Sequence, residues 1–263
     1  MRAVVRKFGF MGYKGLAYRL YERRLESSLA SKPIPKHIGV MCDGNRRWAR
    51  SFGHSDVATG HQAGADKIFE LLKWCRETGV EVVTLWLLST DNLNRSMDEL
   101  EKLLPIIEDT VIGLVEEGWH VKPVGALDLL PDSTARVLKK AADATMDNPG
   151  LTVNVAVGYG GRQEIADAVR SLLVDRASEG ATIHDVAETI TVESIAEHLY
   201  TAGQPDPDLV IRTSGEQRIG GFLLWQSTHS ELHFCDAYWP AFRKVDFLRA
   251  LRSYSERNRR FGA

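Results

Sequence analysis

Short, almost continuously apolar segments alternate with longer segments of helical periodicity along most of this chain. The apolar segments, which we interpret as strands, are His37–Cys42, Glu81–Leu88, 119–124, Leu151–Val157, Leu209–Ile211 and Leu232–Phe234. The segments with helical periodicity are 16–30, 61–78, 97–117, 132–146, 162–178, 192–200 and 244–258. Strands that are apolar throughout are typical of a parallel sheet covered by helices on both faces. We therefore predict an α/β fold: a single domain with a mostly parallel central sheet flanked by helices.

The composition excludes several classes of protein. A net charge of −2 over 263 residues provides no general basic field, so we expect no nucleic-acid partner. Cys42, Cys75 and Cys235 are an odd number of cysteines without a C-x-x-C spacing. We expect them to be reduced thiols of a cytoplasmic protein rather than a disulfide or zinc framework. The sequence contains no apolar run of transmembrane length.

The first 30 residues form a basic segment and a helix ahead of the main domain, which we place at 31–263. Residues 1–15 mix basic with apolar side chains and contain three glycines, which make them a poor helix. Two interpretations stay open: a loose terminus, or peripheral contact with an anionic surface at the inner face of the cell membrane. An amphipathic helix over 16–30 follows, and a proline-rich turn ends it.

A carboxylate, a glycine and two arginines follow the first predicted strand directly. A glycine turn into a helix with adjacent arginines is typical of a phosphate site. A carboxylate repels an anion, but it can hold a divalent cation that bridges to the phosphate. The run thus indicates an enzyme that acts on a diphosphate with Mg²⁺ through Asp43, Gly44, Asn45, Arg46 and Arg47. The alternative is an ordinary helix that Asp43 caps.

Further polar clusters follow other predicted strands, at the edge where parallel sheets bind ligands. In the cluster that begins at Ser89, the hydroxyl and Asn92 could orient a proton and Arg95 could neutralise phosphate. Taken alone, this cluster is better explained by a turn into the next helix. Tyr159–Arg162 is explained as a tight turn.

The cluster Arg212–Arg218 is a stronger signal. Arg212, Ser214 and Arg218 form a compact anion cradle between two apolar segments. The alternative is a solvated loop in which Glu216 balances the arginines.

Two isolated residues complete the candidates. Glu231 stands among apolar residues, where a carboxylate is either paired or a metal ligand. Because Glu231 begins its strand, it would have to reach the site from the side or from a second subunit. His61 heads a helix, and phosphate binding, capping and a surface role all stay open.

Together these motifs resemble those of the cis-prenyltransferases, the undecaprenyl diphosphate synthase family, from about His37 to the C-terminus. Asp43 to Ala49 is similar to the family signature D-G-N-x-R-W-A, and Ser89 to Arg95 is similar to S-[ST]-E-N-W-x-R. Further similar segments are Asn154–Arg162, Arg212–Arg218, Phe222–Gln226, Ser230–Leu232 and Arg260–Gly262. The departures include Asp91 for glutamate, Leu93 for tryptophan, and a glycine, Gly220, where a serine often contacts phosphate.

The resemblance implies a catalytic domain that condenses isopentenyl diphosphate with an allylic diphosphate and forms a Z double bond. It implies Mg²⁺ held by Asp43 and Glu231, and proton removal assisted by Ser89 and Asn92. It implies substrate binding by Gly44, Asn45, Arg46, Arg47, Trp48, His61, Arg95, Arg212, Ser214 and Arg218. It also implies an elongated apolar tunnel and a homodimer in which Arg260–Gly262 reach the partner's active site.

Product length is predicted from one strand position. Side chains alternate along a strand, so Leu85, Leu87 and Ser89 should share a face, and Leu87 should point into the tunnel. Long-chain members of the family tend to carry alanine here. We therefore expect a short-chain enzyme that resembles the Z-farnesyl diphosphate synthases and takes geranyl diphosphate. The alternatives are that Leu87 is ordinary sheet core, that the chain is a long-chain polyprenyl diphosphate synthase, or that it is a non-catalytic partner subunit.

Overall fold

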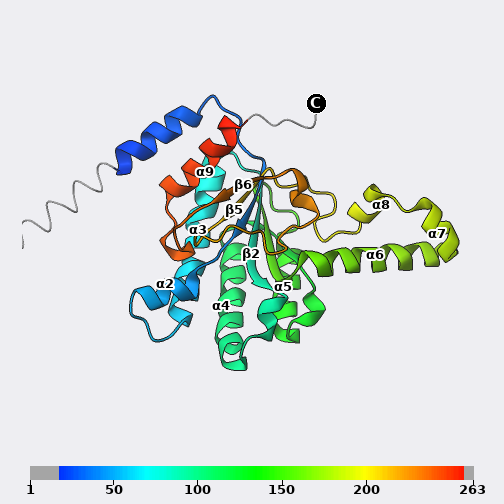
Figure 1. Cartoon of the computed structure of the whole chain (residues 1–263). Coiled ribbons are helices and arrows are strands. Elements are labelled where there is room, and N and C mark those ends of the chain that lie inside the picture. The colour runs from blue at the N-terminus through cyan, green and yellow to red at the C-terminus, as the bar shows by residue number, and fades with distance from the viewer. Residues whose placement is uncertain (1–17, 258–263) are drawn as a thin grey trace, which may run out of the picture.

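Six parallel strands in the order β3-β4-β2-β1-β5-β6 form the centre of the molecule (Figure 1). The computed structural model describes residues 18–257. The strands are β1 (His37–Met41), β2 (Val82–Ser89), β3 (His120–Val124), β4 (Thr152–Tyr159), β5 (Leu209–Arg212) and β6 (Glu231–Phe234). Every neighbouring pair runs parallel. The predicted α/β class is confirmed, and the sheet of the described residues is parallel throughout.

One face of the sheet carries the larger core cluster. It is covered by α3 (Ala58–Thr78), α4 (Met97–Glu116), α5 (Asp132–Thr145) and α9 (Lys244–Glu256). The helix of residues 18–29 joins the same cluster through the buried side chains of Leu25 and Leu29. The described part of the N-terminal segment is therefore packed on the main core.

The opposite face carries a smaller cluster that contains Met41, Phe222 and Leu223. The rings of Trp86 and Phe222 stack there with their centroids 5.1 Å apart. A Cβ atom at Gly39 of β1 would lie 2.9 Å from the Phe222 ring, so only glycine allows this close packing. The segment that carries Phe222 thus packs tightly beneath the strand that leads to Asp43.

Helix α6 (Gly161–Ser178) leaves the sheet and forms a projecting arm with α7 (Ile183–Thr189) and α8 (Val192–Ala196), as Figure 1 shows. The sequence pattern predicts no element at α7, yet a capping box of Thr182 and Asp185 starts a helix there. The predicted helix over 192–200 ends early, at Ala196. The chain does not continue as a helix to residue 200, because the backbone N–H of Tyr200 donates to the Glu164 carboxylate at 3.1 Å instead of to a helical carbonyl.

The pairing of β2 with β4 shifts near the end of both strands. Trp86 lies opposite Ala156, but Leu88 lies opposite Val157 and Ser89 opposite Tyr159. The extra residue on each strand interrupts the alternation of side chains. The prediction that side chains alternate strictly between the two faces of the sheet is therefore wrong beyond Trp86. The consecutive residues Leu87 and Leu88 both pack with the larger core cluster.

Candidate active site

A cleft of about 530 Å³ lies at the carboxyl ends of β1, β2 and β5. Parallel strands end at one edge of a sheet, so the clusters that follow them meet there. The predicted site residues that line the cleft are Asp43, Gly44, Asn45, Arg46, Arg47, His61, Leu87, Ser89, Asn92, Arg95, Arg212 and Arg218.

The turn between β1 and α2 (Asn45–Ser51) brings Asp43 into the cleft. Gly44 has a φ of 106°, and a Cβ atom there would lie 2.8 Å from the Tyr238 ring, so both backbone and space require glycine. Gly44 is the N-cap of α2, and the Asp43 carboxylate faces arginines instead of capping the helix. Because α2 has only seven residues, its dipole adds little, and the attraction of an anion depends on the arginines.

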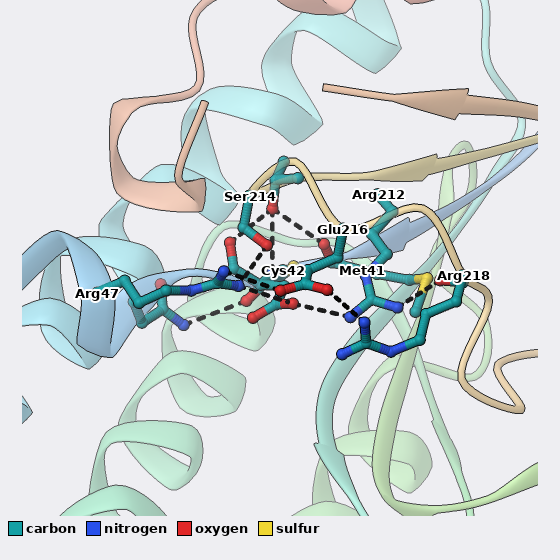
Figure 2. A network of polar contacts seen from close by, with 10 residues as sticks. Met41, Cys42, Arg47, Arg212, Ser214, Glu216 and Arg218 are labelled. Atoms are coloured by element: carbon teal, nitrogen blue, oxygen red, sulfur yellow. Dashed lines mark hydrogen bonds and ion pairs between the residues drawn. The ribbon is translucent and has the colours of Figure 1, made fainter. Parts of the chain in front are cut away.

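The Asp43 carboxylate joins arginines from two elements. Its Oδ2 accepts from Nη2 of Arg212 at 3.0 Å and from Nη2 of Arg47 at 3.4 Å. Arg47 also donates to Oγ of Ser214 at 2.7 Å and to Oε1 of Glu216 at 3.0 Å. Figure 2 shows Glu216 between Arg47 and Arg218. Arg218 donates to Oε2 of Glu216.

The charge state of this network follows from its contacts. Burial raises the pKa of Asp43, but hydrogen bonds from Arg212 and Ser214 outweigh it and hold the pKa below its usual value. Asp43 is therefore ionised at neutral pH. Arg212 is only 7 % exposed, and its Nε has no hydrogen-bond partner among residues 18–257. A buried unpaired donor is costly, so the side chain of Arg212 is held here at the expense of one hydrogen bond.

The loop after β5 is held in an unusual backbone conformation. Ser214 and Gly215 have φ values of 80° and 75°, and a non-glycine residue at such a φ is strained. Thr213 Oγ1 accepts the N–H of Asp43 at 3.0 Å and donates to the Asp43 carbonyl at 2.7 Å. The strained loop thus fixes the backbone of the metal-ligand candidate. Sequence reasoning missed Thr213, although its position between two motif residues is a signal.

Ser89 and Asn92 lie on the other side of the cleft. The Asn92 N–H donates to Oγ of Ser89 at 3.0 Å, which is the turn that the sequence alone favours. The turn and the cleft position coexist, because the hydroxyl caps a short 3-10 helix (Asp91–Asn94) while the side chains line the cleft.

A second carboxylate, that of Glu99, forms ion pairs with two arginines that line the cleft. Glu99, in the first turn of α4, pairs with Arg95 at 2.9 Å and Arg46 at 3.4 Å. His61 Nε2 lies 3.9 Å from Glu99 Oε1. Burial and then the charge of Arg95 lower the pKa of His61 to about 4, so the imidazole is neutral at neutral pH. Sequence reasoning missed Glu99, whose spacing of four from Arg95 is the only signal.

A small, largely apolar cavity lies next to the cleft. Cys42, Asn45, His61 and Leu87 line both the cleft and this cavity, and we call these four residues the neck. The cavity encloses about 30 Å³, and its deeper walls are Ile68, Leu103, Ile106 and Ile107. This cavity has room for about two water molecules, and the elongated tunnel stays a prediction. Leu87 does lie at the position from which it could block a tunnel.

Three predicted site residues lie outside the cleft lining. Ser214 contacts the cleft indirectly, through Arg47. The Trp48 ring packs on Phe52, with the centroids 4.9 Å apart. Glu231 lies opposite Leu209, at the start of β5, whereas the cleft lies at the end of that strand.

The separation of Glu231 from Arg212 along the sheet is three residues, or about 10 Å. Glu231 accepts a hydrogen bond from Arg257 of its own chain. Its role as a metal ligand beside Asp43 stays a prediction that requires a second subunit. The predicted contacts of residues 1–15 and of Arg260–Gly262 lie outside the described residues.

The described part of the chain contains no group of three or more His, Cys, Asp or Glu side chains arranged to hold a metal ion. A Mg²⁺ site built mainly on one carboxylate and substrate oxygens would not form such a group. Among residues 18–257, no helix has the length and apolar character needed to cross a bilayer.

Comparison with known proteins gives consistent matches. The chain is 67% identical over 245 residues to a (2Z,6E)-farnesyl diphosphate synthase of Thermobifida fusca, covering 93% of this chain and 96% of that protein. It is 57% identical over 249 residues to a short-chain Z-isoprenyl diphosphate synthase of Mycobacterium bovis, with coverage of 93% and 95%.

The fold also matches a solved structure, lavandulyl diphosphate synthase of Lavandula x intermedia in complex with dimethylallyl diphosphate. The TM-score is 0.80 at 33% identity, over 88% of this chain and 99% of that one. A family model described as putative undecaprenyl diphosphate synthase matches residues 41–262. The chain belongs to this prenyltransferase family.

Proposed function

We propose that this chain condenses isopentenyl diphosphate with geranyl diphosphate to give (2Z,6E)-farnesyl diphosphate and inorganic diphosphate. The observation that carries the proposal is the convergence of Asp43 with Arg47 and Arg212 in a cleft that shares one wall with an apolar cavity. The arginines match the charge of a diphosphate, and the apolar walls match a short prenyl chain. The names of the relatives support the same reaction.

The allylic diphosphate is assigned to Gly44, Asn45, Arg46 and Arg47, which line the cleft. Its prenyl chain would then pass Leu87 toward the apolar cavity. Arg95 and the neutral His61 complete this subsite. The Trp48 ring packs on Phe52, so Trp48 would act by supporting α2 rather than by touching substrate.

The isopentenyl diphosphate is assigned to Arg212, Ser214 and Arg218. Arg212 and Arg218 line the cleft and supply guanidinium donors for its oxygens. In this assignment the double bond of isopentenyl diphosphate would lie next to the C1 atom of the allylic substrate. Loss of the diphosphate from C1 and attack by the double bond form the new C–C bond. The C2 proton then leaves, and Ser89 and Asn92 orient that proton transfer.

A magnesium ion fits this arrangement. Mg²⁺ is typically held by one or two carboxylates together with substrate phosphates and water, and Asp43 is an ionised carboxylate between two phosphate-binding arginines. When bound, the ion would neutralise charge on the departing diphosphate. Asp43 would hold it, and Glu231 would contribute only from the partner of a homodimer.

A homodimer is proposed on a further observation. The arm of α6, α7 and α8 exposes apolar side chains that a monomer would leave in water, namely Val174, Ile183, Ile190 and Val192. A second copy of the chain would cover them. Sedimentation analysis that finds only monomer at micromolar concentration would contradict this assignment and the role of Glu231 with it.

A short product is proposed because Leu87, a bulky side chain, forms part of the wall between the cleft and the apolar cavity. The names of two similar proteins support the same product class. A non-catalytic subunit is disfavoured because Asp43, Arg47, Arg212 and Arg218 are all in place in the cleft. We place the reaction in the cytoplasm, where the three free cysteines stay reduced.

The test is an assay with radiolabelled isopentenyl diphosphate, Mg²⁺ and dimethylallyl, geranyl or farnesyl diphosphate as the primer. We expect geranyl diphosphate to give a product one prenyl unit longer, with a Z double bond. Chelation of the metal should abolish it, and Asp43→Asn should lower kcat by about 100-fold or more while leaving the fold intact. Long polyprenyl products would favour the long-chain alternative. No Mg²⁺-dependent product from any primer would overturn the proposal.

A further inference from the structure

One carboxylate beside the cleft holds an arginine from each proposed diphosphate subsite. Oε1 of Glu216 accepts from Arg47 at 3.0 Å, and Oε2 accepts from Arg218. Arg47 belongs to the proposed allylic subsite and Arg218 to the proposed isopentenyl subsite. Figure 2 shows the three side chains side by side. The sequence suggests only that Glu216 balances nearby arginines; the structure adds that it spans the two subsites.

The contact of Glu216 closes a ring of five residues. Arg47 donates to Asp43, Asp43 accepts from Arg212, and Arg212 donates to the backbone carbonyl of Arg218. Glu216 then connects Arg218 back to Arg47. Every guanidinium of the ring donates to protein oxygens. A diphosphate that binds through the same N–H groups competes with these oxygens.

On the basis of the proposed function, we infer that Glu216 is a positioning residue that latches the two subsites to each other through Arg47 and Arg218, so that the first diphosphate bound opens the latch for the second. The inference concerns binding and assigns Glu216 no contact with the reacting atoms.

The physical reason is that the two ion pairs of Glu216 support each other. While Arg47 and Arg218 are both bound, the carboxylate has one fixed orientation, and each pair keeps the other in place. A diphosphate that attracts Arg47 leaves Glu216 with a single, partly exposed ion pair. Such pairs contribute little by themselves, so the second diphosphate has less to displace.

The coupling is reciprocal, because the binding free energies of two ligands to one protein are linked. From the strength of exposed ion pairs, we expect each substrate to increase the affinity of the other about two- to five-fold through this latch. Electrostatic repulsion between the two diphosphates acts in the opposite direction. The quantity that isolates the latch is therefore the change in coupling when Glu216 is altered.

The experiment measures isopentenyl diphosphate binding by calorimetry, with Mg²⁺, in the presence and absence of geranyl thiolodiphosphate, which does not react. The coupling is the ratio of the two dissociation constants. Glu216→Gln removes the charge, and Glu216→Asp keeps the charge but shortens the side chain by one methylene. We expect both variants to bind the first ligand more tightly or equally, and to lose the two- to five-fold coupling.

Glu99→Gln is the matched control. Glu99 also pairs with two cleft arginines, but Arg46 and Arg95 both belong to the allylic subsite. Its removal changes the charge by the same amount without separating the two subsites. We therefore expect Glu99→Gln to change allylic affinity and to keep the wild-type coupling. Thermal melting of each variant identifies any loss of fold.

Two results would overturn the inference. An unchanged coupling in both Glu216 variants would show that the latch does not link the subsites, and so would an equal loss in Glu99→Gln. These outcomes leave the proposed function intact, since the wild type would still bind both ligands and form product. A wild type that binds neither diphosphate would overturn the proposed function and the latch with it.

Discussion

Replacement of Leu87 by alanine should lengthen the product, because Leu87 lies at the neck through which a growing prenyl chain must pass. Leu87→Ala removes three carbon atoms beside a cavity of about 30 Å³. The smaller side chain opens the wall between the cleft and this cavity, so the main product from geranyl diphosphate should be longer than that of the wild type. At about 0.8 kcal/mol per fully buried methylene, the half-buried side chain should contribute about 1 kcal/mol to stability, which the fold can lose.

The assay is chromatography of dephosphorylated products, with geranyl diphosphate as the primer and isopentenyl diphosphate in excess. Leu87→Met, which keeps the volume, is the control and should leave the product length unchanged. Ile106→Ala, which opens the same cavity from α4, should act in the same direction as Leu87→Ala. If both alanine variants are folded and active but give the wild-type product, the neck does not limit chain length.

Two further predictions concern charge and backbone strain. His61 should stay neutral at neutral pH, with its imidazole titrating near pH 4 in NMR spectra; a value above 6 would contradict its assignment as a neutral ligand. The unfolded chain binds this proton near pH 6.5, whereas the folded chain binds it only near pH 4. The free energy of unfolding should therefore fall as the pH is lowered from about 6.5 to about 4. In urea titrations, His61→Gln should weaken this pH dependence. Ser214 has a φ of 80°, so Ser214→Gly should be about 1 kcal/mol more stable than Ser214→Ala. Both lose the Arg47 contact and should bind substrate less well; equal stability in denaturant would show that the loop is not strained.

The position of the cleft could be predicted from the sequence because parallel strands end at one edge. The clusters that begin at Asp43, Ser89 and Arg212 follow three different strands, and the structure brings them to one cleft. Asp43 and Arg212, separated by 169 positions in the chain, lie within 3.0 Å of each other. The sheet order was not needed for this conclusion, since strand direction alone determines which ends meet.

The details of the site depend on backbone features that the residue pattern does not encode. Leu87 lies at the neck even though the register of β2 shifts beside it. The prediction thus identifies the right residue, but the strict alternation of side chains on which it is based does not hold at this point of the strand. The contact of Glu216 with Arg47 depends on the left-handed conformation of Ser214 and Gly215. Neither the register shift of β2 nor the left-handed conformation of this loop can be predicted from the polarity or spacing of the residues.

Chain geometry also separates residues that a motif places together. Glu231 is close to the other motifs in the family pattern, but it starts β6 and therefore lies at the opposite end of the sheet from Asp43. Trp48 follows Arg47 directly, yet its ring packs against Phe52 outside the cleft lining. For these two residues, proximity in sequence does not determine proximity to substrate.

A crystal structure with geranyl thiolodiphosphate, isopentenyl diphosphate and Mn²⁺ would test the central assignment most directly. We expect the anomalous signal of the metal beside the Asp43 carboxylate, one diphosphate on Arg47 and the other on Arg212 and Arg218, and the geranyl chain passing Leu87. Metal density remote from Asp43, or diphosphates bound outside the cleft, would contradict the account.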